Sequence, residues 1–314
     1  MTNHSGGAGV PAGTVNPRAG TPGAPRKETD LTAISIVIPA YNEERAIGGV
    51  VEEIQKVCQN ENLDFEIIVV DDGSTDQTLQ SVSDKQIKVL RHPENRGYGA
   101  SIKTGVLAAK HPWILITDAD GTYPVSEIPK LLQDFEHYDM VVGSRTGEEV
   151  NIPVLRKPAK WMLTALANFM VSSHIPDLNS GFRLFRKTSF LRFLNIYPAG
   201  FSLTTTMTLA LLSNNHAVKY VPVNYYKRQG HSKIRPLRDT YNFFLLVLRT
   251  IMYFDPLRIF MPVALFLFLF GLVFTAWEIY VFQNITTAAT IVLFAALQTA
   301  ILGLLADLIV KGRR

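Results

Sequence analysis

The stretch WILITDADGTYP, residues 113–124, ends an apolar run in two aspartates, Asp118 and Asp120, that are separated by one residue. If residues 113–117 form a buried strand, side chains alternate between its faces, so both carboxylates leave it on the same side. Two like charges so close together repel unless a cation or a donor lies between them. A hard ion such as Mg²⁺ binds one or two carboxylates together with substrate phosphate oxygens. The stretch therefore predicts a strand whose two terminal carboxylates bind a cation or a hydrogen-bond donor.

The same pattern of an apolar strand followed by a polar cluster recurs through residues 34–145. Strands are expected at 34–40, 65–70, 87–90, 113–117 and 139–143, and helices at 43–58, 75–83, 99–110 and 124–135. This alternation predicts a parallel, doubly wound sheet, which binds ligands at the carboxyl ends of its strands. The clusters DDGS at 71–74, NRGYG at 95–99 and SR at 144–145 lie at such ends. Alone, DDGS is also compatible with a capped turn, and NRGYG completes neither a dinucleotide fingerprint nor a P-loop.

Two long apolar segments follow, at 259–282 and 285–310, and only Glu278 and Asp307 interrupt them. Each is long enough to cross a bilayer as a helix, which takes about 20 residues. The short link Gln283–Asn284 makes them an antiparallel hairpin, so the two carboxylates are expected near opposite ends and unpaired with each other. Basic residues flank both outer ends, which by the positive-inside rule places the N-terminal region in the cytoplasm. The alternative, a buried helical hairpin of a soluble domain, would normally show a polar face.

Composition narrows the class of protein further. The 314-residue chain has a formal net charge of +4 and one cysteine, Cys58, which excludes an intramolecular disulfide and fits a reducing compartment. Its basic residues gather near the apolar segments instead of alternating with aromatic residues, so anionic lipid or phosphate is a better partner than nucleic acid. Residues 1–30 are rich in Gly, Ala, Pro and Thr. They lack the hydrophobic centre of a signal peptide and are expected to be a disordered tail.

Five motifs occur in the order seen in family-2 glycosyltransferases: IVIPAYNEE at 36–44, VDDGS at 70–74, DAD at 118–120, GSR at 143–145 and SGFR at 180–183. More narrowly, the chain resembles the group of dolichol-phosphate mannose synthases and polyprenyl-phosphate glycosyltransferases. The resemblance implies a GT-A fold, a Rossmann-like α/β domain with a mostly parallel sheet, followed by a two-helix transmembrane hairpin. Composition, hydropathy and the resemblance together divide the chain into a tail at 1–30, a catalytic domain at 31–235, an amphipathic interfacial region at 236–258 and the hairpin at 259–314.

The resemblance also implies roles for individual residues. The residues expected to bind the nucleotide-sugar donor are Pro39, Tyr41, Glu43, Val70, Asp72, Asp118, Ala119, Asp120 and Arg145. Within this set, Asp118 and Asp120 are the expected ligands of Mg²⁺ or Mn²⁺. Catalysis falls to Asp177, Asp120 and Arg145, with Asp177 as the candidate base unless it only caps a turn or pairs with Arg183. Acceptor or phosphate binding falls to Arg183, Lys227, Arg228, Ser232 and Lys233.

Two positions depart from the pattern of the family. Many relatives carry a glutamine where this chain has Thr122, which puts a third protein contact to the metal in doubt. Relatives also carry an arginine three positions before a glycine, whereas this chain has Lys227 before Gly230, with Arg228 beside it. Either basic residue can take the arginine's role.

Together these features predict an inverting transfer of a sugar from a UDP- or GDP-linked donor to a polyprenyl phosphate, giving a lipid-linked monosaccharide at the cytoplasmic membrane face. The expected partners are the nucleotide sugar, the lipid phosphate and the membrane, and a homo-oligomer is left open. One alternative is a processive polysaccharide synthase, but Trp113, Trp161 and Trp277 lie outside the Gln-x-x-Arg-Trp motif usual in that class. Another is a non-catalytic sugar-nucleotide sensor or scaffold, against which the intact aspartates argue.

Overall fold

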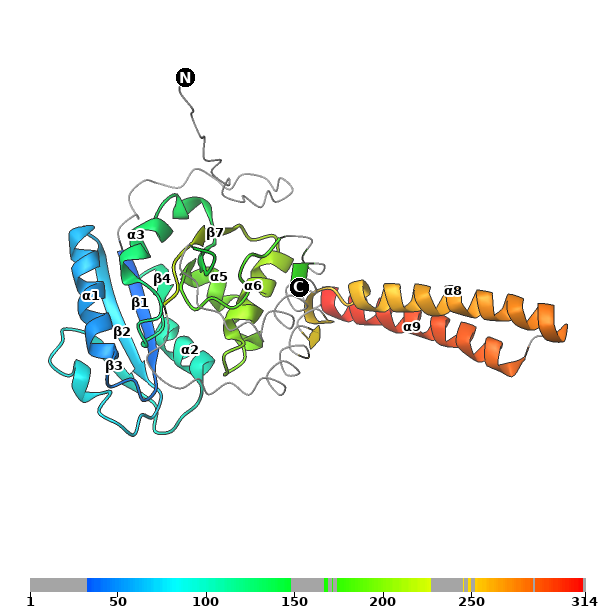
Figure 1. Ribbon diagram of the computed structural model, residues 1–314, viewed down its shortest axis with the longest axis horizontal. Helices are drawn as coiled ribbons and strands as arrows, with labels where there is room; N and C mark the ends of the chain where they lie inside the picture. Colours follow the sequence, from blue (N-terminus) through cyan, green and yellow to red (C-terminus); the bar gives the residue numbers. More distant parts are fainter. Residues whose placement is uncertain are drawn as a thin grey trace, which may run out of the picture. The chain divides into compact units, whose positions relative to one another are not determined.

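The computed structural model describes residues 33–147, 174–226, 252–284 and 286–312, and the single residues 167, 168, 171, 245, 248 and 249. The chain divides into an N-terminal α/β unit and a second unit that contains a C-terminal helical hairpin (Figure 1). The expected tail at 1–30, the acceptor candidates Lys227, Arg228, Ser232 and Lys233, and most of the interfacial region lie outside the described residues.

A mixed sheet forms the centre of the first unit, and in the described part of the chain its seven strands have the order β3-β2-β1-β4-β6-β5-β7. The strands are β1 (Ala33–Ala40), β2 (Asp64–Asp71), β3 (Lys88–Arg91), β4 (Trp113–Ile116), β5 (Met140–Ser144), β6 (Arg183–Arg186) and β7 (Val218–Pro222). β3, β2, β1 and β4 are parallel, and β5 is parallel to β7, whereas β6 is antiparallel to both β4 and β5. The predicted Rossmann-like, mostly parallel domain is confirmed.

Helices cover both faces of this sheet. The side chains of β1 alternate between the two faces and nearly all are buried, so each face needs a helix to cover it. Helix α1 (Ile47–Asn60) buries its apolar stripe in the same core cluster as Ile36 and Ile38. Helix α2 (Tyr98–Ala108) packs on the other face, where a Cβ added at Gly105 would lie 2.3 Å from Val37 Cγ1. The glycine therefore allows α2 to lie directly against β1.

In the described part of the first unit, the remaining helices are α3 (Ile128–Leu131), α5 (Lys187–Leu191) and α6 (Leu203–Ser213), with 3₁₀ turns at Gln80–Val82, Val125–Glu127, Phe135–His137 and Leu194–Ile196. The expected helix at 75–83 is wrong apart from one of these turns, because Ser74 and Thr78 instead accept hydrogen bonds from the amides of Asn42 and Glu43. The expected helix at 124–135 is broken up, since Pro129 lacks an amide proton and suits only a first turn.

Strand direction gathers the predicted motifs at one edge of the sheet. β1, β2, β4 and β5 all run the same way, so their carboxyl ends share this edge. β6 runs the opposite way, so the segment 177–182 that precedes it reaches the same edge. The sequence clusters at 40–44, 71–74, 118–120, 143–145 and 177–183 are therefore neighbours.

The second unit contains two apolar helices, α8 (Leu257–Phe282) and α9 (Thr287–Lys311), with mean hydropathies of 2.5 and 2.2. Both are long and apolar enough to cross a membrane, and few of their residues are buried. The helices pack antiparallel at two glycines, since a Cβ at Gly271 would lie 2.7 Å from Leu293 and one at Gly303 would lie 2.5 Å from Phe260. Small residues of this kind let helix backbones approach closely in a bilayer.

The two carboxylates of the hairpin lie near opposite ends and have separate partners, as expected. Glu278 accepts hydrogen bonds from the amide and the hydroxyl of Thr286, the residue that caps α9. Asp307 pairs with Lys311 over 2.7 Å. Each carboxylate therefore has a partner within the hairpin itself, a hydrogen-bond donor for Glu278 and a cation for Asp307.

Candidate functional site

The two aspartates that follow β4 lie at the shared edge, and both are partly exposed. Asp118 Oδ1 accepts a hydrogen bond of 3.0 Å from the hydroxyl of Tyr98, in the first turn of α2. The carboxylate of Asp118 faces Gly181, where an added Cβ would lie 2.8 Å from Oδ1 and 3.0 Å from Oδ2. A Cβ at this position would force the carboxylate to move, so the 177–183 loop lies directly against Asp118.

Asp120 is oriented by the residue that departs from the family pattern. Its Oδ1 accepts hydrogen bonds from the amide of Thr122 over 3.1 Å and from the hydroxyl of Thr122 over 2.7 Å. Thr122 is completely buried. Its hydroxyl points back to the carboxylate, and so it holds Asp120 in one orientation.

The donor set at Asp118 and Asp120 fits a hard divalent cation. In the described part of the chain, no group of three or more His, Cys, Asp or Glu side chains could hold a metal ion. A cation beside these two carboxylates would therefore complete its shell with oxygens of a substrate or of water, as Mg²⁺ commonly does. The cradle at Gly181 and the all-oxygen donors agree with Mg²⁺ or Mn²⁺.

Asp72, one of the residues predicted to bind the sugar donor, is turned toward the protein. Its carboxylate accepts hydrogen bonds from His92 Nδ1 (2.7 Å) and from the amides of Arg96 (2.9 Å) and Gly97 (2.8 Å). Burial raises the pKa of Asp72, but these hydrogen bonds outweigh it, and the pKa of this carboxyl is lowered. Asp72 thus holds the NRGYG segment in place, with Gly97 at a φ of +97°.

The remaining donor candidates line the ends of β1, β2 and β4. Pro39 is paired with Val70 in the register of β1 and β2. Val70 and Ala119 are buried, and Tyr41 and Glu43 are partly exposed. Their donor roles remain predictions, and the two partly exposed side chains are the ones that a ligand can reach directly.

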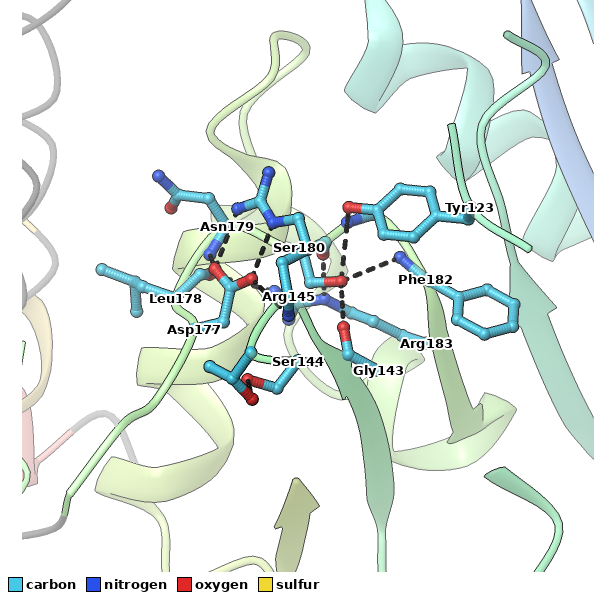
Figure 2. Close-up of polar contacts among 12 residues, drawn as sticks. Tyr123, Gly143, Ser144, Arg145, Asp177, Leu178, Asn179, Ser180, Phe182 and Arg183 are labelled. Atoms are coloured by element: carbon cyan, nitrogen blue, oxygen red, sulfur yellow. Dashed lines mark hydrogen bonds and ion pairs between the residues drawn. The ribbon is translucent and has the colours of Figure 1, made fainter. Parts of the chain in front are cut away.

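Arg145 and Asp177 form a buried ion pair, shown in Figure 2. The Asp177 side chain is 0% exposed and that of Arg145 is 16% exposed. Arg145 Nε donates to Asp177 Oδ2 over 2.7 Å, and Nη2 donates to Oδ1 over 2.8 Å. The guanidinium also lies over the ring of Tyr225, 5.2 Å from its centroid. The Asn179 amide also donates to Asp177 Oδ1 over 3.2 Å, which is a contact of the turn-capping kind.

Arg183, a predicted acceptor contact, lies beneath the loop with a side chain that is 0% exposed. Its guanidinium donates to the carbonyl oxygens of Ser180, Leu178 and Thr204. A side chain enclosed in this way organises the loop backbone. We therefore propose a structural role for Arg183 in place of phosphate binding.

Sequence reasoning missed three tyrosines at this site. Tyr98 orients Asp118, Tyr225 covers Arg145, and the hydroxyl of Tyr123 accepts a hydrogen bond of 2.8 Å from the Gly181 amide. Tyr98 lies inside the noted NRGYG cluster, and Tyr123 lies three residues after Asp120. For Tyr98 and Tyr123, these positions in the sequence were the available signal. The local sequence does not indicate what each hydroxyl binds.

Two family profiles match the chain: Glycosyl transferase family 2 over residues 35–193, and the GtrB C-terminal hairpin over residues 255–311. The dolichyl-phosphate hexose transferase of Haloferax volcanii is 30% identical over 65% of this chain and 87% of its own length. The undecaprenyl-phosphate 4-deoxy-4-formamido-L-arabinose transferase of Pseudomonas fluorescens is 30% identical over 78% of this chain and 72% of its own length.

The fold is also similar to a solved glycosyltransferase. The crystal structure of glucosyl-3-phosphoglycerate synthase from Mycobacterium tuberculosis, in complex with Mn²⁺, UDP-glucose and phosphoglyceric acid, superposes with a TM-score of 0.56. It is 19% identical and covers 70% of this chain and 80% of its own. At this identity the likeness concerns the fold alone, and it confirms the predicted GT-A architecture.

Proposed function

The chain belongs to glycosyl transferase family 2, and from this we propose that it transfers a sugar from a nucleotide sugar to a polyprenyl phosphate with inversion at the anomeric carbon. The observation that carries the proposal is the juxtaposition at one sheet edge of two carboxylates, Asp118 and Asp120, with the guanidinium of Arg145. The loop 177–183 connects them, because Gly181 adjoins Asp118 and Asp177 binds Arg145. The names of the relatives support a lipid phosphate as the acceptor.

The arrangement of charges suits the departure of a nucleoside diphosphate. Asp120, with Asp118, would hold Mg²⁺ or Mn²⁺, which when bound stabilises negative charge on a diphosphate. Tyr98 and Thr122 keep the two carboxylates in fixed orientations, so little reorganisation is needed when the donor binds. Arg145 adds a permanent positive charge at the same edge. Direct attack on the anomeric carbon from the opposite side would invert that centre.

A polyprenyl phosphate suits this site because it brings its own nucleophile. A phosphate monoester loses its second proton at about pH 6, so near neutral pH its oxygen attacks as an anion. Lys227, Arg228, Ser232 and Lys233 remain the predicted contacts of this acceptor. The hairpin of α8 and α9 would hold the catalytic domain at a membrane, where the lipid acceptor resides.

The experiment offers radiolabelled UDP- and GDP-sugars, one at a time, to membranes that contain the full chain, with added polyprenyl phosphate. We expect one sugar donor to give a radiolabelled lipid from which mild acid releases a radiolabelled monosaccharide. Membranes that contain the Asp120→Asn variant should give no radiolabelled lipid. A radiolabelled polymer would instead indicate a processive synthase. Donor binding without any transfer would indicate a sensor or scaffold, and either result would overturn the proposal.

A further inference from the structure

The carboxylate of Asp177 is already occupied by the protein. Its two oxygens accept four hydrogen bonds: from Arg145 Nε (2.7 Å), Arg145 Nη2 (2.8 Å), the Arg145 amide (3.1 Å) and the Asn179 amide (3.2 Å). An ionised carboxylate offers about four lone-pair positions. A general base must bring one of these within reach of the proton that it removes. With a side chain that is 0% exposed, Asp177 offers no such position to an acceptor.

The pair leaves one part of the arginine unused. Asp177 binds the side of the guanidinium formed by Nε and Nη2, while Nη1 donates no hydrogen bond to any described residue. Arginine stays charged at every physiological pH, and its planar fork recognises phosphate oxygens well. Tyr225 covers the face of the guanidinium. What remains for a ligand is therefore a fixed cationic edge.

The loop that carries Asp177 is itself tied down on both sides. From below, Arg183 donates to the carbonyl oxygens of Leu178 and Ser180. In addition, the hydroxyl of Ser180 donates to the carbonyl oxygen of Gly143 over 2.5 Å (Figure 2). Gly143 lies in β5, two residues before Arg145. The loop and the end of β5 are thus joined twice, once through the backbone and once through the ion pair. Asp177 has little freedom to release Arg145 and turn toward a substrate.

We infer that Asp177 is a positioning residue, which holds Arg145 with its Nη1 edge ready for an anionic group of the substrates and takes no proton from the acceptor. The inference rests on the proposed function, and it restricts the acceptor to a group that arrives ionised. In the step that results, the acceptor phosphate oxygen forms the new bond to the anomeric carbon. The bond from that carbon to the diphosphate breaks, both electrons leave with the nucleoside diphosphate, and no proton is transferred.

The first test is the pH dependence of single-turnover transfer to polyprenyl phosphate by the full chain, for wild type and Asp177→Asn, from pH 6 to 8.5. We expect a deficit of about 10²- to 10³-fold, similar to the loss of one preorganised donor, that stays constant across this range. If Asp177 were the base, the deficit would shrink as the acceptor becomes a dianion. A deficit that recovers with pH would overturn the inference.

The second test is a double-mutant cycle with Arg145→Ala and Asp177→Asn, read out as kcat/KM and as the affinity for the nucleoside diphosphate with Mn²⁺. Because Asp177 acts through Arg145, the double variant should be no worse than Arg145→Ala alone, whereas losses from independent roles would multiply. Multiplying losses would overturn the inference. Melting curves of each variant report misfolding separately.

A polyprenol assayed beside the phosphate separates this inference from the proposed function. Transfer to the alcohol alone would defeat the proposed acceptor and, with it, the claim that Asp177 takes no proton. If no lipid accepts the sugar, the proposed function fails, but the coupling of Arg145 and Asp177 in nucleotide binding still decides the positioning role. Losses of nucleotide affinity that multiply in the double variant would overturn it.

Discussion

Each of the two carboxylates after β4 is oriented by one hydroxyl group, Asp118 by Tyr98 and Asp120 by Thr122. A hydroxyl that donates to one oxygen of a carboxylate fixes its rotamer, and groups of this kind around a metal site tune its affinity. The hydroxyl of Thr122 is bonded to the carboxylate of Asp120, and so it acts on this site through Asp120. The departure from the glutamine of many relatives thus has a structural consequence of its own.

Asp120→Asn should abolish transfer while the protein stays folded and membrane-bound, because an amide oxygen carries no net charge with which to bind a divalent cation. Radiolabelled transfer by purified variant and wild type measures this. An excess of chelator should have the same effect on wild type, and added Mg²⁺ or Mn²⁺ should restore activity. Full activity of the chelated wild type would rule out the metal.

Thr122→Val should weaken binding of Mn²⁺ about 10- to 100-fold in the presence of UDP or GDP, because Asp120 loses the hydroxyl that orients it. Thr122→Ser is the matched control, since it keeps the hydroxyl, and it should bind Mn²⁺ nearly as wild type does. Electron paramagnetic resonance of free Mn²⁺ measures the affinity without any turnover. Equal affinities for the valine and serine variants would contradict the orienting role.

At the scale of single elements, helix α2 connects the core to the site. It lies against β1 through Gly105, and its first residue supplies the hydroxyl that binds Asp118. The loop before α6 meets the start of this helix, where a Cβ at Gly99 would lie 2.4 Å from the carbonyl oxygen of Pro198. Close backbone contacts of this kind fix the height of α2 over the sheet. The position of Tyr98 follows from them.

Gly105→Ala should lower the melting temperature and reduce transfer, because the new Cβ would lie 2.3 Å from Val37 Cγ1. Overpacking of this kind costs about 1–3 kcal/mol, which exceeds the gain of up to about 1 kcal/mol from replacing a helical glycine with alanine. Gly49→Ala in α1 is the matched control: it is exposed, with nothing within 4 Å of an added Cβ, and should be stabilising. Thermal melts of both variants measure the difference, and a stabilised Gly105→Ala would refute the close packing.

At the scale of the whole molecule, the chain combines a glycosyltransferase domain with a hairpin that is long and apolar enough to cross a membrane. The turn of the hairpin is built locally: Gln283 has a φ of +50°, and Thr286 caps α9 while binding Glu278. Basic residues at the outer ends favour a cytoplasmic catalytic domain by the positive-inside rule. We therefore propose the domain boundaries and the orientation given by the sequence.

Gln283→Cys, in a background where Cys58→Ser removes the single native cysteine, should react with an impermeant thiol reagent that is added outside intact cells. The turn is expected on the outer face because the hairpin crosses the membrane and returns. A cysteine at Lys311 is the control and should react only after permeabilisation. The reverse pattern would overturn the orientation.

Local sequence patterns were sufficient for the elements that are buried by their own apolar residues. The strands expected at 34–40, 65–70 and 113–117 agree with β1, β2 and β4 to within one residue at each end. The hairpin helices expected at 259–282 and 285–310 agree within two residues. These segments are continuous apolar runs, so the residues that decide their burial lie within the segments themselves.

The pattern was not sufficient where the deciding contact lies far away along the chain. Within the α/β unit the predicted elements ended at residue 143, so β6, α5, α6 and β7 were missed. β6 has the short sequence RLFR, and its two arginines hide the apolar signal of a buried strand. Arg183 can be buried there only because carbonyl groups of the 177–180 loop and of α6 accept its hydrogen bonds. No local periodicity reports such partners.

The same distinction holds for the site. The sequence alone determined that polar clusters follow strand ends and that Asp118 and Asp120 leave β4 together, because strand alternation is a local property. Only the tertiary structure decided that Asp177 binds Arg145, 32 positions away, and that Tyr98 binds Asp118, 20 positions away. Those contacts depend on strand order and on the reversed direction of β6, which bring distant segments to one edge. Burial and competing donors then decide which predicted residues remain open to a substrate.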